Sequence, residues 1–116
     1  MLHTIIAYVE DKPGVLNRVA SLFRRRAYNI ESLAVGHTHL PGVSRMTIIV
    51  NAAEKETSSR IEANLYKLVN ILRVHDITSE LAVFRELAMV KVSTKTQETR
   101  THVMQLVDVF RARVVD

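Results

Sequence analysis

The fold is decided by residues 9–23, VEDKPGVLNRVASLF, where an extended pattern gives way to a helical one across four residues. Residues 2–9, LHTIIAYV, are β-branched and apolar on both faces, which predicts a central strand covered on each side. After Pro13-Gly14, apolar residues recur at helical spacing and predict a helix to about Arg26. Its expected core-facing stripe is Leu16, Val19, Ala20 and Phe23. The stretch therefore predicts a strand, a tight corner and a helix.

The corner at residues 11–14 is a candidate anion-binding site. The first backbone N–H groups of a helix have no partner within the helix and lie at the positive end of its dipole. A plain turn is the alternative, because short connections between strands and helices are common. The corner residues alone leave both interpretations open.

Two further strands are predicted at residues 28–37 and 43–52, joined by a hairpin loop that contains Pro41-Gly42. Ser59 and Glu62 have capping-box spacing and predict the start of a second helix. The expected apolar stripe of this helix is Ile61, Leu65, Leu68, Val69 and Leu72. Residues 71–78, ILRVHDIT, predict a short strand.

The predicted order through residue 78 is strand, helix, strand, strand, helix, strand, which is the ferredoxin-like βαββαβ arrangement of an α+β domain. Residues 80–93 then form another extended run, and an apolar stripe at Val103, Leu106, Val107 and Phe110 predicts a further helix. Residues 111–116 resemble the start of a strand. We therefore expect a complete domain at residues 1–78 and part of a second α/β domain at residues 79–116, as in a fragment or a short member of its family.

Composition narrows the class of protein. The chain has 116 residues, is 47% hydrophobic and contains no cysteine, so it can bury a core and cannot use a thiolate site or a disulfide. Its N-terminus lacks the pattern of a secretion signal, and no apolar run approaches the roughly 18 residues that span a bilayer. We expect a cytoplasmic protein with no membrane partner. The net charge of +4 is only a weak indication of a nucleic-acid partner.

Catalytic and metal-binding patterns are absent from the sequence. There is no nucleophile–histidine–acid spacing, no Walker phosphate loop and no HExxH motif. His37 and His39 share a strand face, but two histidines without a third ligand favour surface residues over a metal site. Arg24, Arg25 and Arg26 complement a helix C-terminus, with a docking face for an acidic partner or RNA as the alternative. The predicted strand SRMTIIV carries no stacking aromatic side chain, so nucleic-acid binding is not expected.

Four stretches carry a family resemblance: EDKPGVLNRVASLF at 10–23, YNIESLAVG at 28–36, SRMTIIV at 44–50 and RELAMVKV at 85–92. Together they resemble the regulatory small subunit of acetolactate synthase, which begins with an ACT domain. The glycine at the first corner is common to ACT domains in general, whereas YNIESL followed by SRMT is far more specific to this family. The resemblance extends over essentially the whole chain, although members of the family continue further.

The resemblance implies a non-catalytic subunit of branched-chain amino-acid biosynthesis. Such a subunit binds the large catalytic subunit, raises its activity and makes it sensitive to valine. The large subunit would use thiamine diphosphate, Mg and FAD, whereas this chain would hold no cofactor. One alternative is a free-standing amino-acid-binding ACT protein that regulates another enzyme or a transcription factor; another is an RNA-binding ferredoxin-like domain, disfavoured by the missing aromatic residues.

The resemblance also implies that ACT domains pair side by side, with the effector at the dimer interface. The expected effector contacts are Asp11, Gly14, Val15, Leu16, Asn29 and Ile30, the last two from the neighbouring subunit. Backbone N–H groups of the corner would bind the effector's carboxylate, and Asp11 would bind its ammonium group or cap the helix. The amide of Asn29 suits either charged group, with a turn residue as the alternative.

One residue departs from the family pattern. The position before Tyr28 is usually glycine in the family, at the left-handed end of a helix, and here it is Ala27. A left-handed alanine costs about 1–2 kcal/mol. Either the helix ends differently in this chain, or the strain is tolerated next to Asn29.

Overall fold

The computed structural model describes all residues from 1 to 116. It divides into two compact units, Met1–Val83 and Phe84–Asp116, and each is described by itself. The predicted boundary between the domains at residue 78 stays a prediction. No helix in either unit is long and apolar enough to cross a membrane.

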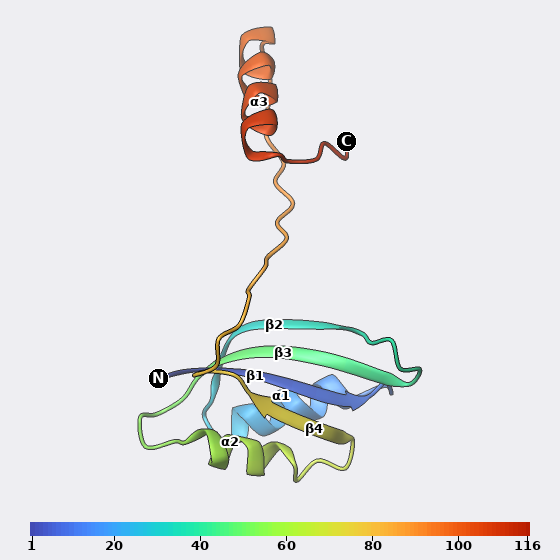
Figure 1. Ribbon diagram of the computed structural model, residues 1–116, viewed down its shortest axis with the longest axis vertical. Coiled ribbons are helices and arrows are strands. Elements are labelled where there is room, and N and C mark those ends of the chain that lie inside the picture. Colours follow the sequence, from blue (N-terminus) through green and yellow to red (C-terminus); the bar gives the residue numbers. More distant parts are fainter. The chain divides into compact units, whose positions relative to one another are not determined.

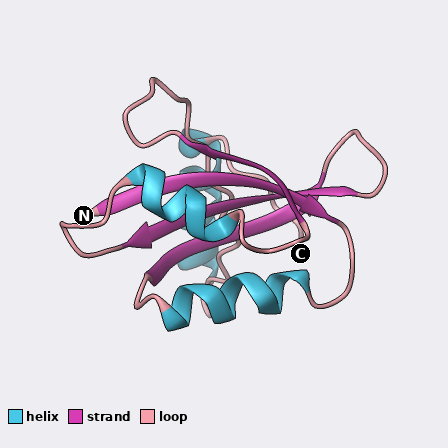
Figure 2. Cartoon of the chain, turned by 90° about the horizontal axis from the view of Figure 1, so that it is seen from below, coloured by secondary structure: helices cyan, strands magenta, loops and turns pink.

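The first unit is a four-stranded antiparallel sheet with two helices (Figure 1). The strands are β1 (Leu2–Glu10), β2 (Asn29–His37), β3 (Val43–Asn51) and β4 (Ile71–Asp76), in the spatial order β2-β3-β1-β4. The helices α1 (Val15–Arg25) and α2 (Ser58–Leu65) lie together on one face of the sheet, as Figures 1 and 2 show. This confirms the predicted α+β, ferredoxin-like βαββαβ fold.

The hydrophobic core lies between the sheet and the two helices. Alternate residues of β1 and β3 point into it, so that Ile5 faces Ile48 and Ala7 faces Met46, all at most 2% exposed. Ile6 does not belong to this core cluster, and Thr4 and Tyr8 on the same side of β1 are partly exposed. The prediction that β1 is covered on both faces is therefore wrong within this unit, because both helices pack on the same side.

Two predicted helical faces are also corrected. In α1 the core residues are Val15, Val19, Leu22 and Phe23, and Leu16 is 44% exposed. The predicted set placed the stripe about one residue too far around the helix, because Val15 rather than Leu16 is the first residue to pack inward. The exposed Leu16 is free to contact a ligand or another chain.

The second helix is shorter than the pattern suggested. Its N-cap is Thr57, whose side chain accepts a hydrogen bond from the Arg60 N–H, so the Ser59–Glu62 capping box is wrong. Ile61 and Leu65 are buried as predicted, but the helix ends there. Val69 is 83% exposed and Leu72 belongs to β4. The apolar residues of β4 continued the helical spacing by coincidence.

The end of α1 adopts the left-handed conformation that the family pattern reserves for glycine. Ala27 has φ 57°, and the Tyr28 N–H donates to the Phe23 carbonyl while the Ala27 N–H donates to the Arg24 carbonyl. This is the Schellman pattern of a helix C-terminus. Of the two possibilities left open by the sequence, the strained alanine is the one that occurs.

Tyr28 anchors the chain that follows this turn. Its hydroxyl donates to Glu56 Oε2 at 3.0 Å and accepts from Asn64 Nδ2 at 2.9 Å, and its ring meets Phe23 edge to face at 5.6 Å. Burial, followed by the hydrogen bond to Glu56, raises the pKa of the Tyr28 hydroxyl. The buried ring fixes where β2 begins, and so where Asn29 lies.

The second unit contains one helix, α3 (Gln97–Phe110), and no strand. Thr96 caps its N-terminus by accepting from the Thr99 N–H, and Arg111 ends it with φ 52°. The helix is placed as predicted, but none of its residues is buried. Residues 80–93 and 111–116 form no strand, contrary to the prediction, because no neighbouring strand accepts or donates their backbone hydrogen bonds.

Candidate functional site

The candidate site begins at the corner between β1 and α1. The Asp11 N–H donates to the Gly42 carbonyl at 2.9 Å, which ties the corner to the β2–β3 hairpin. Gly14 is the N-cap of α1, with φ 84°, a conformation that favours glycine. An added Cβ at Gly14 would meet no atom within 4 Å, so the side of the corner that Gly14 presents is open. The backbone conformation favours glycine, and the open space makes its N–H approachable.

The first N–H groups of α1 are largely unused. The Val15 N–H makes a long hydrogen bond of 3.4 Å to the Lys12 carbonyl, and the Arg18 N–H donates to the Gly14 carbonyl at 3.0 Å. The N–H groups of Gly14, Leu16 and Asn17 have no acceptor in the chain. No side chain caps the helix, and its first turn has no acidic residue. The positive end of α1 is therefore open to an anion.

Asp11 does not cap the helix, so that alternative is wrong. Its carboxylate instead lies 3.2 Å from His37 Nδ1 at the end of β2. Both side chains are solvent-accessible, with exposures of 45% for Asp11 and 84% for His37. Asp11 thus places a negative charge in the corner that precedes α1, in contact with the end of the edge strand β2. His37 had been predicted as a surface residue, and its contact with Asp11 joins two segments 26 residues apart, which local sequence patterns do not reveal.

Asn29 and Ile30 begin β2. The Asn29 side-chain amide donates to Glu31 Oε1 at 2.8 Å on the exposed edge of the sheet. Pairing with β3 is irregular between Ile30 and Ser32, which marks a β-bulge at Glu31. Ile30 is a partly buried residue packed against the core. Asn29 is thus an ordered strand residue with an exposed amide, rather than a turn residue.

Within one chain the two halves of the predicted site are far apart. Asn29 pairs with Asn51, which in turn pairs with Leu2 at the start of β1. The corner follows Glu10 at the other end of β1. Eight residue steps of extended strand separate these ends by about 26 Å. The structure groups Asp11, Gly14, Val15 and Leu16 at one end of the sheet, and Asn29 with Ile30 at the other.

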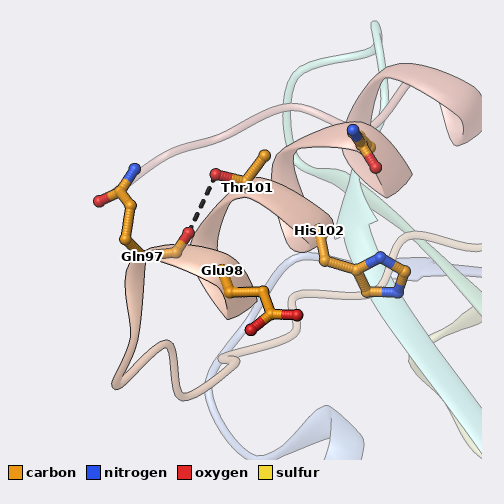
Figure 3. Close-up of a pocket in the computed structure, with 5 residues that line it drawn as sticks. Gln97, Glu98, Thr101 and His102 are labelled. Carbon is orange, nitrogen blue, oxygen red and sulfur yellow. Dashed lines mark hydrogen bonds between the residues drawn. The ribbon is translucent and has the colours of Figure 1, made fainter.

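The structure has two surface hollows, and neither is lined by a predicted effector contact, although His37, the partner of Asp11, lines the second. One follows a polar face of α3 and is lined by Gln97, Glu98, Thr101, His102 and Gln105 (Figure 3). Its lining comes from a single helix, and the hydrogen bond drawn there is the Thr101 hydroxyl donating to the Gln97 carbonyl at 2.9 Å. Such a notch has no opposing wall to hold a ligand. The chain contains no group of three or more histidine, aspartate or glutamate side chains able to hold a metal ion.

Comparison with known proteins gives two matches along the chain. Residues 5–73 match the family of AHAS small subunit-like ACT domains, and residues 85–116 match the family described as small subunit of acetolactate synthase. The chain belongs to the acetolactate synthase small-subunit family. The predicted resemblance is therefore confirmed over both units.

Individual members of the family are similar over nearly the whole chain. The probable acetolactate synthase small subunit of Methanothermobacter thermautotrophicus is 44% identical over 98% of this chain and 67% of its own length. The acetolactate synthase small subunit of Mycobacterium leprae is 47% identical over 98% of this chain and 66% of its own. The chain thus spans about two thirds of the length of these relatives.

Similarity to solved structures supports the same fold and family. The acetolactate synthase small subunit from Thermotoga maritima aligns with a TM-score of 0.74 at 33% identity, over 100% of this chain and 71% of that one. The ACT domain from GTP pyrophosphokinase of Chlorobium tepidum aligns with a TM-score of 0.55 at 17% identity, over 66% of this chain and 96% of that one. The latter supports the fold alone. The former supports both the fold and the family.

Proposed function

We propose that this small-subunit chain regulates the large catalytic subunit of acetolactate synthase, raising its activity and conferring feedback inhibition by valine. The observation that carries the proposal is the open corner, where Gly14 and the first residues of α1 offer unused N–H groups and Asp11 of the same corner offers an exposed carboxylate. A free amino acid carries a carboxylate and an ammonium group, and this arrangement offers a partner for each. Family membership supplies the enzyme that such a sensor would regulate.

The chemistry of the proposed site suits a small branched amino acid. The N–H groups of Gly14 and Leu16 would donate to the effector's carboxylate. Asp11 would accept from its ammonium group. The exposed side chain of Leu16 would contact the aliphatic portion, which favours valine, isoleucine or leucine over polar amino acids. Val15 is 4% exposed, so its contribution is the backbone rather than the side chain.

Asn29 and Ile30 join this site only from a second chain. The strand β2 is an edge of the sheet, and two of its exposed apolar residues are Leu33 and Val35. An antiparallel pairing of two β2 strands centred on Leu33 would bring Asn29 opposite the partner subunit's His37. Since His37 contacts Asp11 within its own chain, this pairing would carry Asn29 to the partner's corner. We therefore propose a homodimer through the ACT units, with each site shared by two chains.

The cofactors belong to the proposed partner rather than to this chain. The large subunit would hold thiamine diphosphate, Mg and FAD, and the acetolactate-forming reaction would take place there. The small-subunit chain would bind the effector and the large subunit, and would take no part in the reaction itself. We place this regulatory role in the cytoplasm.

Reconstitution tests the proposal. The chain alone should show no acetolactate synthase activity, and adding it to the large subunit should raise turnover and make turnover sensitive to valine. Gly14→Asp should abolish valine sensitivity while leaving activation intact, because it places a carboxylate where the effector's own carboxylate would bind. Arg100→Asp on α3 introduces the same side chain at an exposed position and should change neither property. Activity of the isolated chain, or failure to activate the large subunit, would contradict the proposed function.

A further inference from the structure

A row of three side chains crosses the sheet on the face that carries neither α1 nor α2. In the register of the sheet, Tyr8 of β1 pairs with Arg45 of β3 on one side and with Arg73 of β4 on the other. The neighbours of Tyr8 along β1, Ala7 and Val9, belong to the core. Tyr8 therefore points to the opposite face, which Figure 1 shows free of α1 and α2. We call Tyr8, Arg45 and Arg73 the arginine–tyrosine row.

The charges of this row are not neutralised within the chain. Neither Arg45 nor Arg73 takes part in any of the ion pairs or side-chain hydrogen bonds, and both are exposed. The nearest carboxylate along β1 is Glu10, which is already bound by Lys12 at 2.6 Å. On β4, His75 contacts Glu80 at 2.7 Å. Two free guanidinium groups thus flank an aromatic ring on an open sheet.

The surroundings of the row resemble the surface of an interface. Ile6, which is 9% exposed, lies on the same face next to Tyr8, and the partly exposed Ile49 lies further along that face, opposite Thr4. Next to the row a hollow of about 260 Å³ is lined by Tyr8, His37, Thr38, His39, Leu40 and Arg45. Tyrosine and arginine are, with tryptophan, the residues most enriched at the energetic centres of protein interfaces. Apolar residues with tyrosine and arginine around them indicate a docking surface rather than a merely solvated face.

Charge decides which kind of occupant suits this surface. A second copy of the chain bound face to face would place arginine against arginine. Residues 84–116 carry six lysines and arginines against four aspartates and glutamates, so they are basic overall and do not complement the row. Planar guanidinium groups bind carboxylates in a bidentate manner. The matching partner is therefore an acidic segment of another protein.

We propose that an acidic segment of the catalytic large subunit docks on the arginine–tyrosine row, with its carboxylates on Arg45 and Arg73 and an apolar side chain against Tyr8. This inference rests on the proposed function, which supplies the partner. The row also lies close to the effector corner, because β1 runs from Tyr8 through Glu10 directly into Asp11. A change at the corner on effector binding would be carried by the same strand that bears the docking surface.

The test measures association of the full chain with the large subunit, together with valine binding by each variant. Arg45→Glu combined with Arg73→Glu should weaken association by about tenfold or more, because each change places a carboxylate against an acidic partner. Association of the unchanged chain should weaken as salt is raised, and the double variant should lose most of that dependence. The matched control, Lys55→Glu with Lys67→Glu at exposed positions on either side of α2, changes charge equally away from this face and should associate within about twofold of the unchanged chain. Tyr8→Ser should weaken association while keeping the salt dependence.

The outcomes distinguish failure of the proposed regulatory function from failure of the docking surface. If the unchanged chain neither binds nor activates the large subunit, the proposed function fails and the docking surface fails with it. If the unchanged chain binds and the double variant binds equally well, or the control weakens as much as the double variant, the docking surface is wrong while the regulatory function stands. If the unchanged chain binds a single-stranded RNA oligonucleotide and only the double variant loses that binding, the row is a nucleic-acid surface and the proposal is overturned. Retained valine binding shows that a variant is folded.

Discussion

Residues 1–83 and 84–116 contain similar sequence patterns, but only the first unit buries a hydrophobic core. Both units have an extended run and an amphipathic helix that is followed or ended by a left-handed residue, Ala27 after α1 and Arg111 at the end of α3. In the first unit, α1 buries Val15, Val19, Leu22 and Phe23 against the sheet, whereas α3 buries none of its residues. An apolar pattern therefore specifies a helix locally, and only a facing layer turns it into a source of stability.

Hydrogen exchange should give the largest contrast between the two units. Backbone amides of β1 and β3 should exchange only through global unfolding, with protection of about 5 kcal/mol or more. Amides of residues 80–116 should exchange much faster, because they have no strand partners and α3 has no buried face. Protection at residues 84–116 that rises with protein concentration would show that copies of the chain pair there. Protection equal to that of β3 in a dilute monomer would show that the two units form one cooperative fold.

Truncating one apolar side chain in each unit should give the next largest difference between the units, measured as the loss in the free energy of unfolding. Ile48→Ala in β3, at a position that is 0% exposed, should lower the free energy of unfolding by about 2–5 kcal/mol, through lost burial and a cavity. Leu106→Ala in α3, at a position that is 43% exposed, should change it by less than about 0.5 kcal/mol. Urea denaturation of both variants measures the contrast. A comparable loss from Leu106→Ala would mean that α3 is packed against a core.

A buried carboxylate should add an acid-sensitive contribution to the first unit only. Burial by itself would raise the pKa of Asp76, but hydrogen bonds from the Thr78 hydroxyl and N–H and from Ser58, with the charge of His3, lower it overall. The stabilisation from Asp76 is therefore present above its usual pKa of about 3.8 and is lost as pH falls through the lower value in the folded state. Asp76→Asn should lower stability at pH 7 by about 1–3 kcal/mol and make the acid limb of the stability curve less steep.

The matched change Asp108→Asn in α3 should leave the stability curve of the first unit unchanged. Denaturation of both variants at a series of pH values between 2 and 7 provides the comparison. An unchanged acid limb in Asp76→Asn would show that this carboxylate is not the sensitive group.

Replacing the two left-handed residues by glycine should give the smallest changes in the free energy of unfolding. Ala27→Gly should raise the free energy of unfolding by about 1 kcal/mol, because glycine adopts the observed φ of 57° without a Cβ clash. Arg111→Gly makes the equivalent change at the end of α3 and should not move the cooperative transition of the first unit. Thermal denaturation of the two variants distinguishes them. Destabilisation by Ala27→Gly would contradict the account of strain at this turn.

Much of the first unit could be predicted from its sequence. The two-residue period of Met46, Ile48 and Val50 and the Pro-Gly corner place strands and helix correctly, because each element packs against a layer in the same chain. Predictions were wrong where local spacing was ambiguous, as when Leu72 continued a helical pattern into β4. They were also wrong at residues 80–93, where a strand pattern had no partner strand. Periodicity reports which side of an element is apolar, but it does not report what will cover that side.

The candidate site was predictable only in part. The corner sequence raised an open helix terminus as one of two interpretations, and the structure shows that no side chain caps α1 and that Gly14 has a left-handed backbone. The contact of Asp11 with His37 and the separation of Asn29 from the corner depend on strand order and register, which local patterns do not contain. The roles of the six proposed effector contacts stay predictions.

The central claim, that valine binds at a site shared by two chains, is tested most directly by calorimetry on mixed variants. Gly14→Asp and Asn29→Ala should each weaken valine binding by about 1 kcal/mol or more when measured alone, on the order of a hydrogen bond to a charged group. Each mixed dimer should contain one site made of the intact corner of the Asn29→Ala chain and the intact Asn29 of the Gly14→Asp chain. After the two variants are unfolded and refolded together, about one site in four should therefore bind valine with the original affinity. A mixture that binds no better than either variant alone, or an unchanged chain that binds no valine, would contradict the account.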